Sequence, residues 1–431
     1  MIGNMNIINN IVVKFFLTIV FYIIFLLTLD IFPNKHLFAI FSFSVYLLNR
    51  PTFILSPRNM IFIYYFLWFG LAPIFADRYN YLDYSDNIVY KSYVYLSSSF
   101  ITMILVSMCI ETKYEKKFSF IKVDYSNVRI DGKKLTFTFI FSFLFFLLYL
   151  FNTGGFSYWI ANIDRAFLTR QGAGVYYLGF SLFFPVFIFF TRFKYKNLIL
   201  LSTLSLLVIA LSPFIGSKQK IIYCFLLLFS SLILRRKLTL SNSLMIGLPT
   251  IFLFVLGNYF RNVSWMTLSD VASYSFNYFD TLDSLLLFLY NRHYPFEIMS
   301  VGLPLNKIVN LYTGGDEFFD VSAYYTNIYF PDAWNIRATV QFPVEVDLFL
   351  SFGFWVGLIP LGIFVGIYSL IFIKMLSSEK IVYGFIWFNL FFYLLSHMRG
   401  GLFIWTDLYL YPYLILVYFL FKEVKVNVPK K

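Results

Sequence analysis

The chain has 431 residues, of which 60% are hydrophobic, 23% are aromatic and only 13% are charged. Because about 25% of residues are charged in a typical soluble domain, this composition excludes an ordinary soluble protein and predicts an integral membrane protein. The net charge is +12, but no basic patch lies on a soluble module, so nucleic-acid binding is not expected. The two cysteines, Cys109 and Cys224, match neither a disulfide framework nor a metal-binding spacing.

Apolar runs recur along the whole chain, which predicts an all-α, polytopic fold in a single integral membrane domain, residues 1–431. A membrane-spanning helix needs about 20 mostly apolar residues, because its backbone groups must be bonded internally. The first span is expected to be a retained helix, since no small-residue cleavage site precedes Asp30. We predict about twelve spans by this criterion: residues 12–32, 37–54, 60–75, 90–110, 135–152, 175–191, 197–213, 220–234, 242–260, 348–373, 381–396 and 402–421.

The basic residues predict how these helices are oriented. The connector 111–134 contains seven Lys and Arg residues, so the positive-inside rule places it in the cytoplasm. Alternation from that connector then puts 22 of the 34 basic residues on the cytoplasmic side, together with only six of the 22 acids. Both termini are predicted to be cytoplasmic, and the positive net charge is interpreted as a signal of topology.

Two long segments are predicted on the outer side, residues 153–174 and residues 261–347. In the first, glycines flank a short amphipathic piece that is expected to be re-entrant or interfacial. In the second, residues 276–289 have apolar side chains at helical spacing, with Asp280 and Asp283 on a more polar face. This helix is predicted to lie along the membrane surface.

The tenth predicted span contains four glycines, Gly353, Gly357, Gly362 and Gly366. Small residues separated by one helical turn let two helix backbones approach closely in a membrane. We therefore predict tight packing of this helix against a neighbouring helix.

The motifs of familiar soluble enzymes are absent, including HExxH, CxxC, GxSxG, GxGxxG and the Walker loop. What remains is a set of cations on the predicted outer side, where the positive-inside rule disfavours them. Diphosphate binding would explain them, because Arg offers a planar fork and Lys a compact charge to phosphate. The alternative is that each cation reaches lipid headgroups or pairs with a nearby acid. The eight cations are Arg165, Arg170, Lys218, Lys220, Arg261, Arg292, Arg337 and Arg399.

Three short motifs accompany this topology: Gly-Ser-Lys at residues 216–218, Phe-Asp-Thr-Leu-Asp at 279–283 and Arg-Gly-Gly-Leu-Phe at 399–403. Together with a dozen helices and a late, large outer loop, they resemble Wzy-type polymerases of O-antigen or capsule repeat units. The resemblance covers nearly the whole chain and implies a GT-C-like membrane fold. Family members commonly have Arg in the turn before the eighth helix, where this chain has Lys218.

The resemblance implies that a growing glycan moves from undecaprenyl diphosphate to a hydroxyl of the next lipid-linked unit. The reaction would take place on the periplasmic face of the bacterial inner membrane. The implied partners are the undecaprenyl-diphosphate-linked oligosaccharide and the lipid bilayer, and a chain-length regulator protein is left open. No cofactor or metal is expected, since Glu345 and Asp347, although spaced like a metal motif, also stand where acids favour a helix start.

Such a transfer needs positive charge where the lipid diphosphate departs and has use for a base at the acceptor hydroxyl. The predicted catalytic residues are Asp280, Asp283, His293 and Arg399, and all eight outer cations are candidates for diphosphate binding. Glu345 and His397 are further candidates for the base, although His397 is more simply interpreted as a hydrogen-bonded loop residue.

Two other functions stay open from the sequence. An O-antigen ligase would share the architecture and the lipid-linked donor, and would differ in its acceptor. A lipid-linked oligosaccharide flippase or another secondary transporter would be expected to have two six-helix halves joined by a central cytoplasmic loop. The connector after the sixth predicted span, residues 192–196, is too short for such a loop.

Overall fold

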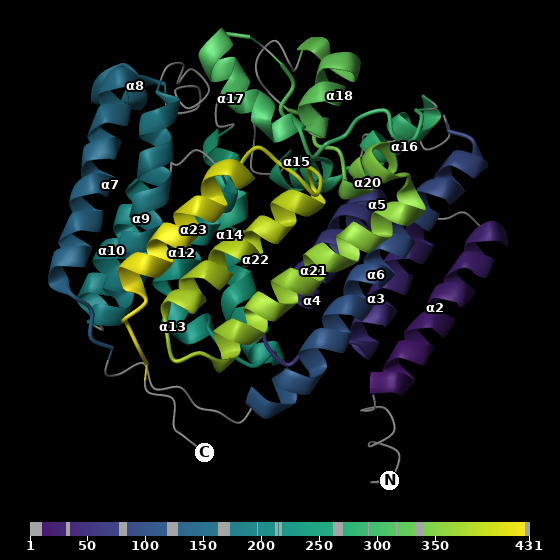
Figure 1. Cartoon of the computed structure of the whole chain (residues 1–431), viewed down its shortest axis with the longest axis horizontal. Coiled ribbons are helices and arrows are strands. Elements are labelled where there is room, and N and C mark those ends of the chain that lie inside the picture. Colours follow the sequence, from purple (N-terminus) through teal and green to yellow (C-terminus); the bar gives the residue numbers. More distant parts are fainter. Residues whose placement is uncertain are drawn as a thin grey trace.

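The structure is a computed structural model, and it describes residues 11–31, 35–76, 84–118, 128–162, 173–195, 197–211, 214, 218–261, 270–291, 293–315, 317–332 and 339–426. Within these residues the regular structure is helical, apart from two isolated β-bridges, Phe53–Lys237 and Lys380–Lys425. The helices form a single bundle (Figure 1), with one large hydrophobic core and a second, small cluster around Trp159. The predicted all-α class is therefore confirmed for this part of the chain.

Within the part of the chain that the structure describes, six helical segments are long and apolar enough to cross a membrane. They are α2 (Ile11–Ile31), the continuous run of α4 (Pro57–Tyr64), η1 (Tyr65–Leu71) and α5 (Ala72–Phe75), α6 (Asp86–Phe118), α7 (Gly132–Asn152), α9 (Gly174–Lys194) and α21 (Phe354–Ser377). Shorter apolar stretches are α3 (Lys35–Leu48), α10 (Leu198–Ala210), the segment Leu240–Val255 of α14 (Leu240–Arg261), α22 (Val382–Met398) and α23 (Asp407–Phe421). Helices α12 (Lys218–Leu228) and α13 (Ser230–Ile233) lie among them. The membrane character agrees with the prediction, whereas the number of twelve spans stays a prediction.

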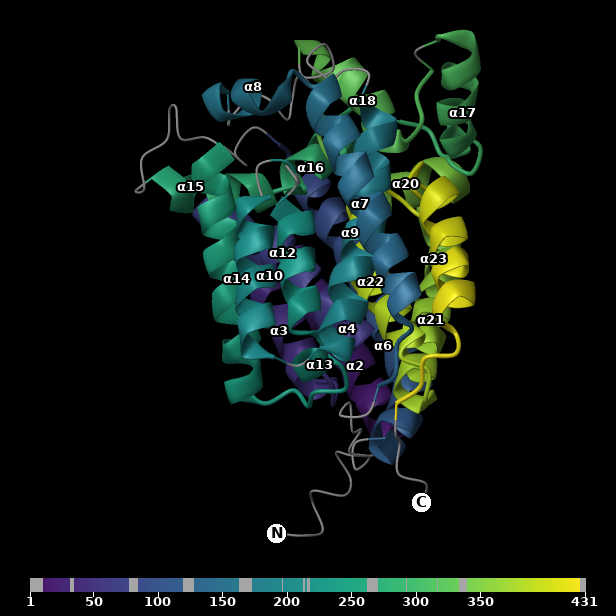
Figure 2. The ribbon, with the colours of Figure 1, turned by 90° about the vertical axis from the view of Figure 1, so that its left-hand side faces the viewer.

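Short helices gather at one end of the bundle, which is uppermost in Figure 2. Each of them comes from a segment predicted to lie outside the membrane, or from its border with a predicted span, so we name this the outer end and the opposite one the inner end. These helices are α8 (Gly155–Ala161), α15 (Asp270–Phe279), α16 (Leu282–Tyr290), α17 (Leu303–Thr313), α18 (Val321–Tyr329) and α20 (Val344–Phe352).

The described parts of the connectors that carry the basic clusters lie at the inner end, where α2 begins and α23 ends (Figures 1 and 2). Lys134 Nζ donates to the carbonyl of Leu420 (2.7 Å), and Arg235 Nη2 donates to the carbonyl of Met375 (2.8 Å). Because the last carbonyls of a helix have no partner within it, these basic side chains also cap α23 and α21. The basic clusters thus share one end as predicted, and its cytoplasmic location stays a prediction.

Two glycines of the tenth predicted span, Gly362 and Gly366, pack α21 against α6, and the two helices run alongside each other in Figure 1. A Cβ atom at Gly362 would lie 3.5 Å from Val106 Cγ2, and one at Gly366 would lie 3.4 Å from Ile110 Cδ1. Both distances are van der Waals contacts, so the backbone of α21 already lies close to the side chains of α6. The predicted tight packing is confirmed.

Three predicted spans are not single α-helices. The span 348–373 is divided at Gly353, whose positive φ of 66° separates α20 from α21. The span 60–75 contains the π-helical stretch η1, and the span 220–234 is interrupted between α12 and α13. The span 37–54 ends early because Arg50 precedes Pro51, and a residue before proline is disfavoured in the helical region. Apolar composition predicts burial in a membrane but does not reveal such local breaks.

The orientation can be tested with an impermeant thiol reagent on intact cells. In a background with Cys109→Ser and Cys224→Ala, a Gly315→Cys variant should react, because residue 315 is exposed at the outer end. A Glu423→Cys variant should be protected, because residue 423 is exposed at the inner end, which the positive-inside rule places in the cytoplasm. Permeabilised cells provide the control, in which both should react. The opposite pattern in intact cells would invert the topology.

Candidate functional site

The structure describes the side chains of five of the predicted site residues: Lys220, Asp280, Asp283, His293 and Arg399. Arg165, Arg170, Arg292 and Arg337 lie outside the described residues. Lys218 begins α12 and Arg261 ends α14, but their side chains are also outside the described part. The Gly-Ser-Lys turn before α12 is likewise not described beyond Lys218.

Arg399 is a buried cation at the outer end of α22. Its backbone N–H closes the last turn of that helix by donating to the carbonyl of Leu395 (3.1 Å). The guanidinium carbon lies 5.4 Å from the ring centroid of Trp68 and 5.4 Å from that of Tyr278, and Nη2 donates to the Tyr278 hydroxyl (3.3 Å). Two aromatic rings therefore hold the plane of the guanidinium.

No described carboxylate lies within ion-pair distance of Arg399, and its Nε has no hydrogen-bond partner among the described atoms. The residue is only 9% exposed. We expected Arg399 in a five-residue outer turn, residues 397–401, but α22 ends at Met398 and α23 begins at Asp407, so the turn is residues 399–406. Protein rather than solvent surrounds the guanidinium, and a buried charge without a partner favours an anionic ligand.

Helix α4 and the π-helical stretch η1 that follows it each contribute an aromatic side chain to this site. Tyr64, the last residue of α4, donates its hydroxyl proton to the carbonyl of Met398 (2.6 Å), directly before Arg399. Trp68 on η1 packs edge-on against Phe279 of α15, with ring centroids 4.5 Å apart. Stretches of π-helix are rare and often occur at functional sites. Here α4, η1, α15 and α22 converge on one guanidinium.

Glu345 is the acid that the structure places next to this cluster. It lies in the first turn of α20, is fully buried, and accepts a hydrogen bond from the Tyr65 hydroxyl on Oε1 (2.6 Å). Its Oε2 has no partner among the described atoms. Burial raises the pKa of Glu345 to about 7, although the Tyr65 hydrogen bond acts in the opposite direction. A carboxyl group with that pKa is suited to accept or donate a proton near neutral pH.

Asp347 has a different role from Glu345. Its Oδ2 accepts the backbone N–H of Leu402 (2.7 Å), and its Oδ1 accepts the Ser351 hydroxyl (2.8 Å). Gly401 has a φ of +123°, and a Cβ atom there would lie only 2.8 Å from Asp347 Oδ2. Gly401 therefore allows the close approach of an internal carboxylate.

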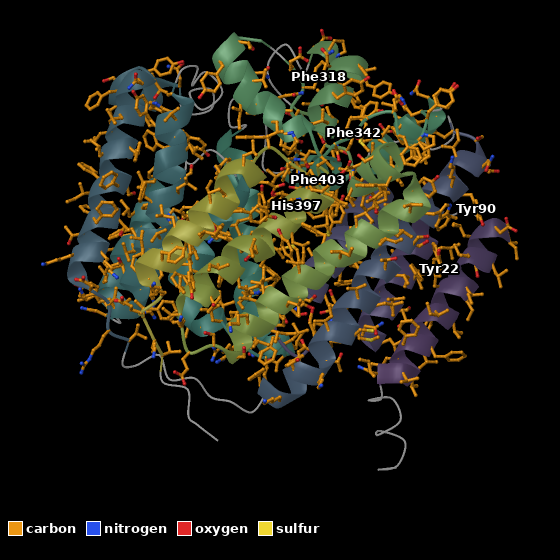
Figure 3. The ribbon with its side chains drawn as sticks, viewed as in Figure 1. Tyr22, Tyr90, Phe318, Phe342, His397 and Phe403 are labelled. Atoms are coloured by element: carbon orange, nitrogen blue, oxygen red, sulfur yellow. The ribbon has the colours of Figure 1, made fainter. Side chains whose placement is uncertain are left out.

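His397 lies in the last turn of α22 and is 1% exposed, so it is not the loop residue that we expected. Its Nδ1 is 3.1 Å from the carbonyl of Gly401, and its Nε2 is 3.3 Å from Asp407 Oδ1. Because a carbonyl can only accept, Nδ1 must carry a proton and donate it. Figure 3 labels His397 with Phe403 near the outer end of α22. The hydrogen bond from His397 thus fixes the carbonyl of Gly401 within the turn.

The predicted helix 276–289 is broken at Asp280 and Thr281, so the two aspartates do not share one polar face. Asp280 is buried, and its Oδ1 accepts the backbone N–H of Leu282 at the start of α16 (3.1 Å). Asp283 is half-buried, its Oδ1 is 3.5 Å from the Tyr84 hydroxyl, and burial raises its pKa. The break places Asp280 directly after Tyr278 and Phe279, which contact the Arg399 cluster.

His293 belongs to a separate cluster of aromatic side chains. It stacks on Phe288 with ring centroids 4.8 Å apart, and its Nδ1 lies 3.1 Å from Glu297 Oε2. Its Nε2 bonds the Tyr329 hydroxyl. None of these contacts reaches Arg399, so the structure does not bring His293 into the same cluster as Glu345.

Lys220 lines a cavity of about 170 Å³ between α9, α12, α22 and α23. Its Nζ donates to the Tyr177 hydroxyl (3.1 Å) and the Ser181 hydroxyl (3.4 Å), and lies 4.5 Å from the Tyr177 ring centroid. Asn389 and Ser396 add polar groups, whereas much of the remaining wall is apolar. The sequence did not indicate this cavity, because its polar residues come from several helices that are far apart along the chain.

Comparisons with known proteins add no relative to this description. No family model, no curated protein and no solved structure matches the chain. Among the described residues, no group of three His, Cys, Asp or Glu side chains is arranged to hold a metal ion.

The raised pKa of Glu345 predicts a pH-dependent stability. The folded-state pKa is about 7 against an ordinary 4.5, so its stabilising contribution is complete below about pH 4.5 and is lost as the pH rises through about 7. The corresponding loss is about 3 kcal/mol in the free energy of unfolding. Thermal unfolding in lipid nanodiscs from pH 5 to 8 measures it, and Glu345→Gln should remove this part of the pH dependence. An identical pH profile in the variant would contradict the assignment.

Proposed function

We propose that this chain joins lipid-diphosphate-linked oligosaccharide repeat units into a polysaccharide at the outer side of a bacterial inner membrane. The observation that supports the proposal best is Arg399, a buried guanidinium without a described acidic partner at the outer end of the bundle. It is a site for an anion that reaches the protein from the outer half of the membrane. A lipid diphosphate is an anion of this kind.

The guanidinium suits the leaving group of the proposed reaction. When the bond between the sugar and the diphosphate breaks, negative charge develops on the phosphate oxygen that departs. A fixed cation in a site of low dielectric stabilises that charge without reorganisation. Trp68 and Tyr278 keep the guanidinium in place, and Arg can bind two phosphate oxygens at once.

Glu345 is the best placed group for the acceptor. In the proposed step, the acceptor hydroxyl oxygen bonds to the anomeric carbon of the donor glycan, and the carbon–oxygen bond to the diphosphate breaks with its electron pair. The hydroxyl proton passes to Glu345, whose Oε2 has no described partner and whose pKa is about 7. Asp280 is the second candidate, because it follows Tyr278 at the break between α15 and α16.

The cavity at Lys220 offers a second place for a prenyl phosphate. A polymerase of this kind binds two lipid-linked substrates, and each carries a diphosphate. Apolar side chains such as Phe180, Phe184 and Phe392 line the cavity beside the ammonium group. An apolar wall with one cation matches the chemistry of a phosphate that is attached to an isoprenoid chain. Lys220 is therefore proposed as a diphosphate contact that is distinct from Arg399.

The reaction can be tested with purified protein in lipid nanodiscs. Given lipid-diphosphate-linked repeat units as the sole substrate, a polymerase should produce a ladder of longer glycans on lipid diphosphate. Transfer only to an added lipid A core acceptor would indicate a ligase instead. Movement of the lipid-linked unit across a vesicle membrane without any new glycosidic bond would indicate a flippase, and either result would reject the proposal.

Substitution of Arg399 tests the group that carries the proposal. Arg399→Ala should lower the rate of polymerisation about a hundredfold or more, since a lost charge-assisted contact in a desolvated site costs about 3 kcal/mol. Arg399→Lys should recover only part of the rate, because it keeps the charge and loses the fork. Arg236→Ala is the control, since Arg236 is an exposed cation of the inner end.

The measurement is glycan chain length in cells at matched membrane levels of each variant. Wild-type ladders from Arg399→Ala would remove this residue from the site. Full activity in Arg399→Lys would indicate that residue 399 only has to be a cation that interacts with lipid headgroups.

A further inference from the structure

A second group of buried charges lies at the inner end, where Arg58 of α4 meets two glutamates of α6. Arg58 Nε is 3.2 Å from Glu111 Oε2, and Arg58 Nη2 is 2.5 Å from Glu115 Oε2. The side chains of the three residues are 2%, 0% and 4% exposed. We expected Glu111 and Glu115 on the solvated inner face, but α6 continues to Phe118 and buries both. We name these three residues the buried triad.

The charges of the buried triad do not balance if both carboxyl groups are ionised. One guanidinium and two carboxylates leave a net charge of −1 away from water, which costs several kcal/mol even after relaxation. Arg58 is the one described cation within ion-pair distance of either carboxylate. The usual solution in a protein is that such a group binds a proton.

Other charged and titratable groups on the surrounding elements do not supply the missing charge. Arg50 donates to the carbonyl of Leu238, Lys374 lies over the Tyr383 ring, and Tyr46 donates to Asn59. Further charged or titratable groups on the helices packed around the triad include Lys14 on α2, Asp86, Lys91, Lys113 and Lys117 on α6, and Tyr368 on α21, and none of these lies within ion-pair distance of Glu111 or Glu115.

The hydrogen bonds of the buried triad indicate which oxygen can carry a proton. Arg58 uses Nη1 for the carbonyl of Asn49 (2.8 Å), so each of its guanidinium nitrogens has an acceptor. Glu115 accepts from Arg58 and, on Oε1, from the backbone N–H of Thr52 (3.2 Å). Both Glu115 oxygens thus face donors that cannot accept a hydrogen bond. Glu115 is therefore the ionised partner of Arg58.

Glu111 differs, because its Oε1 faces a hydroxyl. Ser369 Oγ lies 3.0 Å from that oxygen and 3.2 Å from Ser107 Oγ. A serine hydroxyl has a single hydrogen and cannot donate to both neighbours. If Ser369 donates to Ser107, its lone pair is available to a proton on Glu111 Oε1. The arrangement accommodates a protonated Glu111 without an unpaired donor.

We propose that the buried triad is a proton-binding site, in which Glu111 carries one proton that it donates to Ser369 while Glu115 is the ionised partner of Arg58. In this form the triad is electrically neutral. It joins the connector before α4, helix α6 and helix α21 at the inner end of the membrane region. Because the folded chain binds a proton that the unfolded chain releases at neutral pH, stability falls as the pH rises.

Infrared spectroscopy of the protein in lipid nanodiscs tests the proposal, since a protonated carboxyl group has a C=O band that a carboxylate lacks. At pH 8 the wild-type protein should show this band, and Glu111→Gln should lose it. Glu115→Gln should lose it as well, because Glu111 then ionises as the sole partner of Arg58. Glu345→Gln is the matched control and should keep the band of Glu111, because it replaces a buried carboxyl group that does not belong to the triad.

Thermal unfolding provides the second readout. Glu111→Gln should remove a pH dependence equivalent to about tenfold in the unfolding equilibrium constant per pH unit, which is the effect of one proton. Ser369→Ala, which removes the acceptor and preserves the charges, should shift the frequency of the band. A band that persists unchanged in Glu111→Gln and in Ser369→Ala would overturn the assignment. Persistence in Glu115→Gln would overturn the charge balance on which it rests.

Discussion

The outer site depends on two buried carboxyl groups in the first turn of α20, and each of them fixes a different segment of the site. Asp347 accepts the N–H of Leu402 and so fixes the turn that begins at Arg399. Glu345 accepts the Tyr65 hydroxyl and so joins α20 to the π-helical stretch that carries Trp68. Loss of either carboxylate would leave a buried donor unpaired, at a cost of about 1–3 kcal/mol. The guanidinium thus depends on a helix that does not contact it directly.

The two ends of the bundle use their cations differently. At the inner end, Lys134 and Arg235 donate to helix carbonyls, and Arg58 has a carboxylate at each side of its guanidinium. Each of these cations is neutralised or caps a helix. Arg399 has aromatic rings and a phenol instead, and these stabilise a cation without cancelling its charge. The positive potential at the outer end therefore remains available to a ligand, which is the physical basis of the proposed diphosphate site.

Hydropathy and charge were sufficient to predict the helical class, the membrane character and the gathering of basic connectors at one end. Those properties depend on sums over many residues, so single errors do not matter. The local breaks at Gly353 and at Asp280 depend on a single φ angle and a single capping carboxylate. Composition contains no signal for either. The interpretation of residues 276–289 as one surface helix failed for this reason.

The candidate site was predictable only in part. Arg399 was identified as a cation on the predicted outer side and as part of the motif at residues 399–403, yet its burial by Trp68 and Tyr278 depends on contacts across about 330 and 120 residues of chain. Glu345 was one of several acids, and nothing in its sequence neighbourhood distinguishes it from Asp347. Only packing reveals that one carboxylate is held by the backbone of a turn while the other has an oxygen without a described partner.

Interrupted helices surround the site, and this follows from the requirements of a membrane. Backbone that leaves the helical path must find its hydrogen bonds in the protein, because lipid offers none. The turn after α22 finds them in Asp347 and His397, and the break before α16 finds them in Asp280. These irregular segments also hold the two charged groups of the site. Asp347 fixes the turn that begins at Arg399, and Glu345 lies in the same helical turn as Asp347. The site that we propose for the charged headgroup of a lipid therefore lies where the helices end irregularly, rather than in the middle of the bundle.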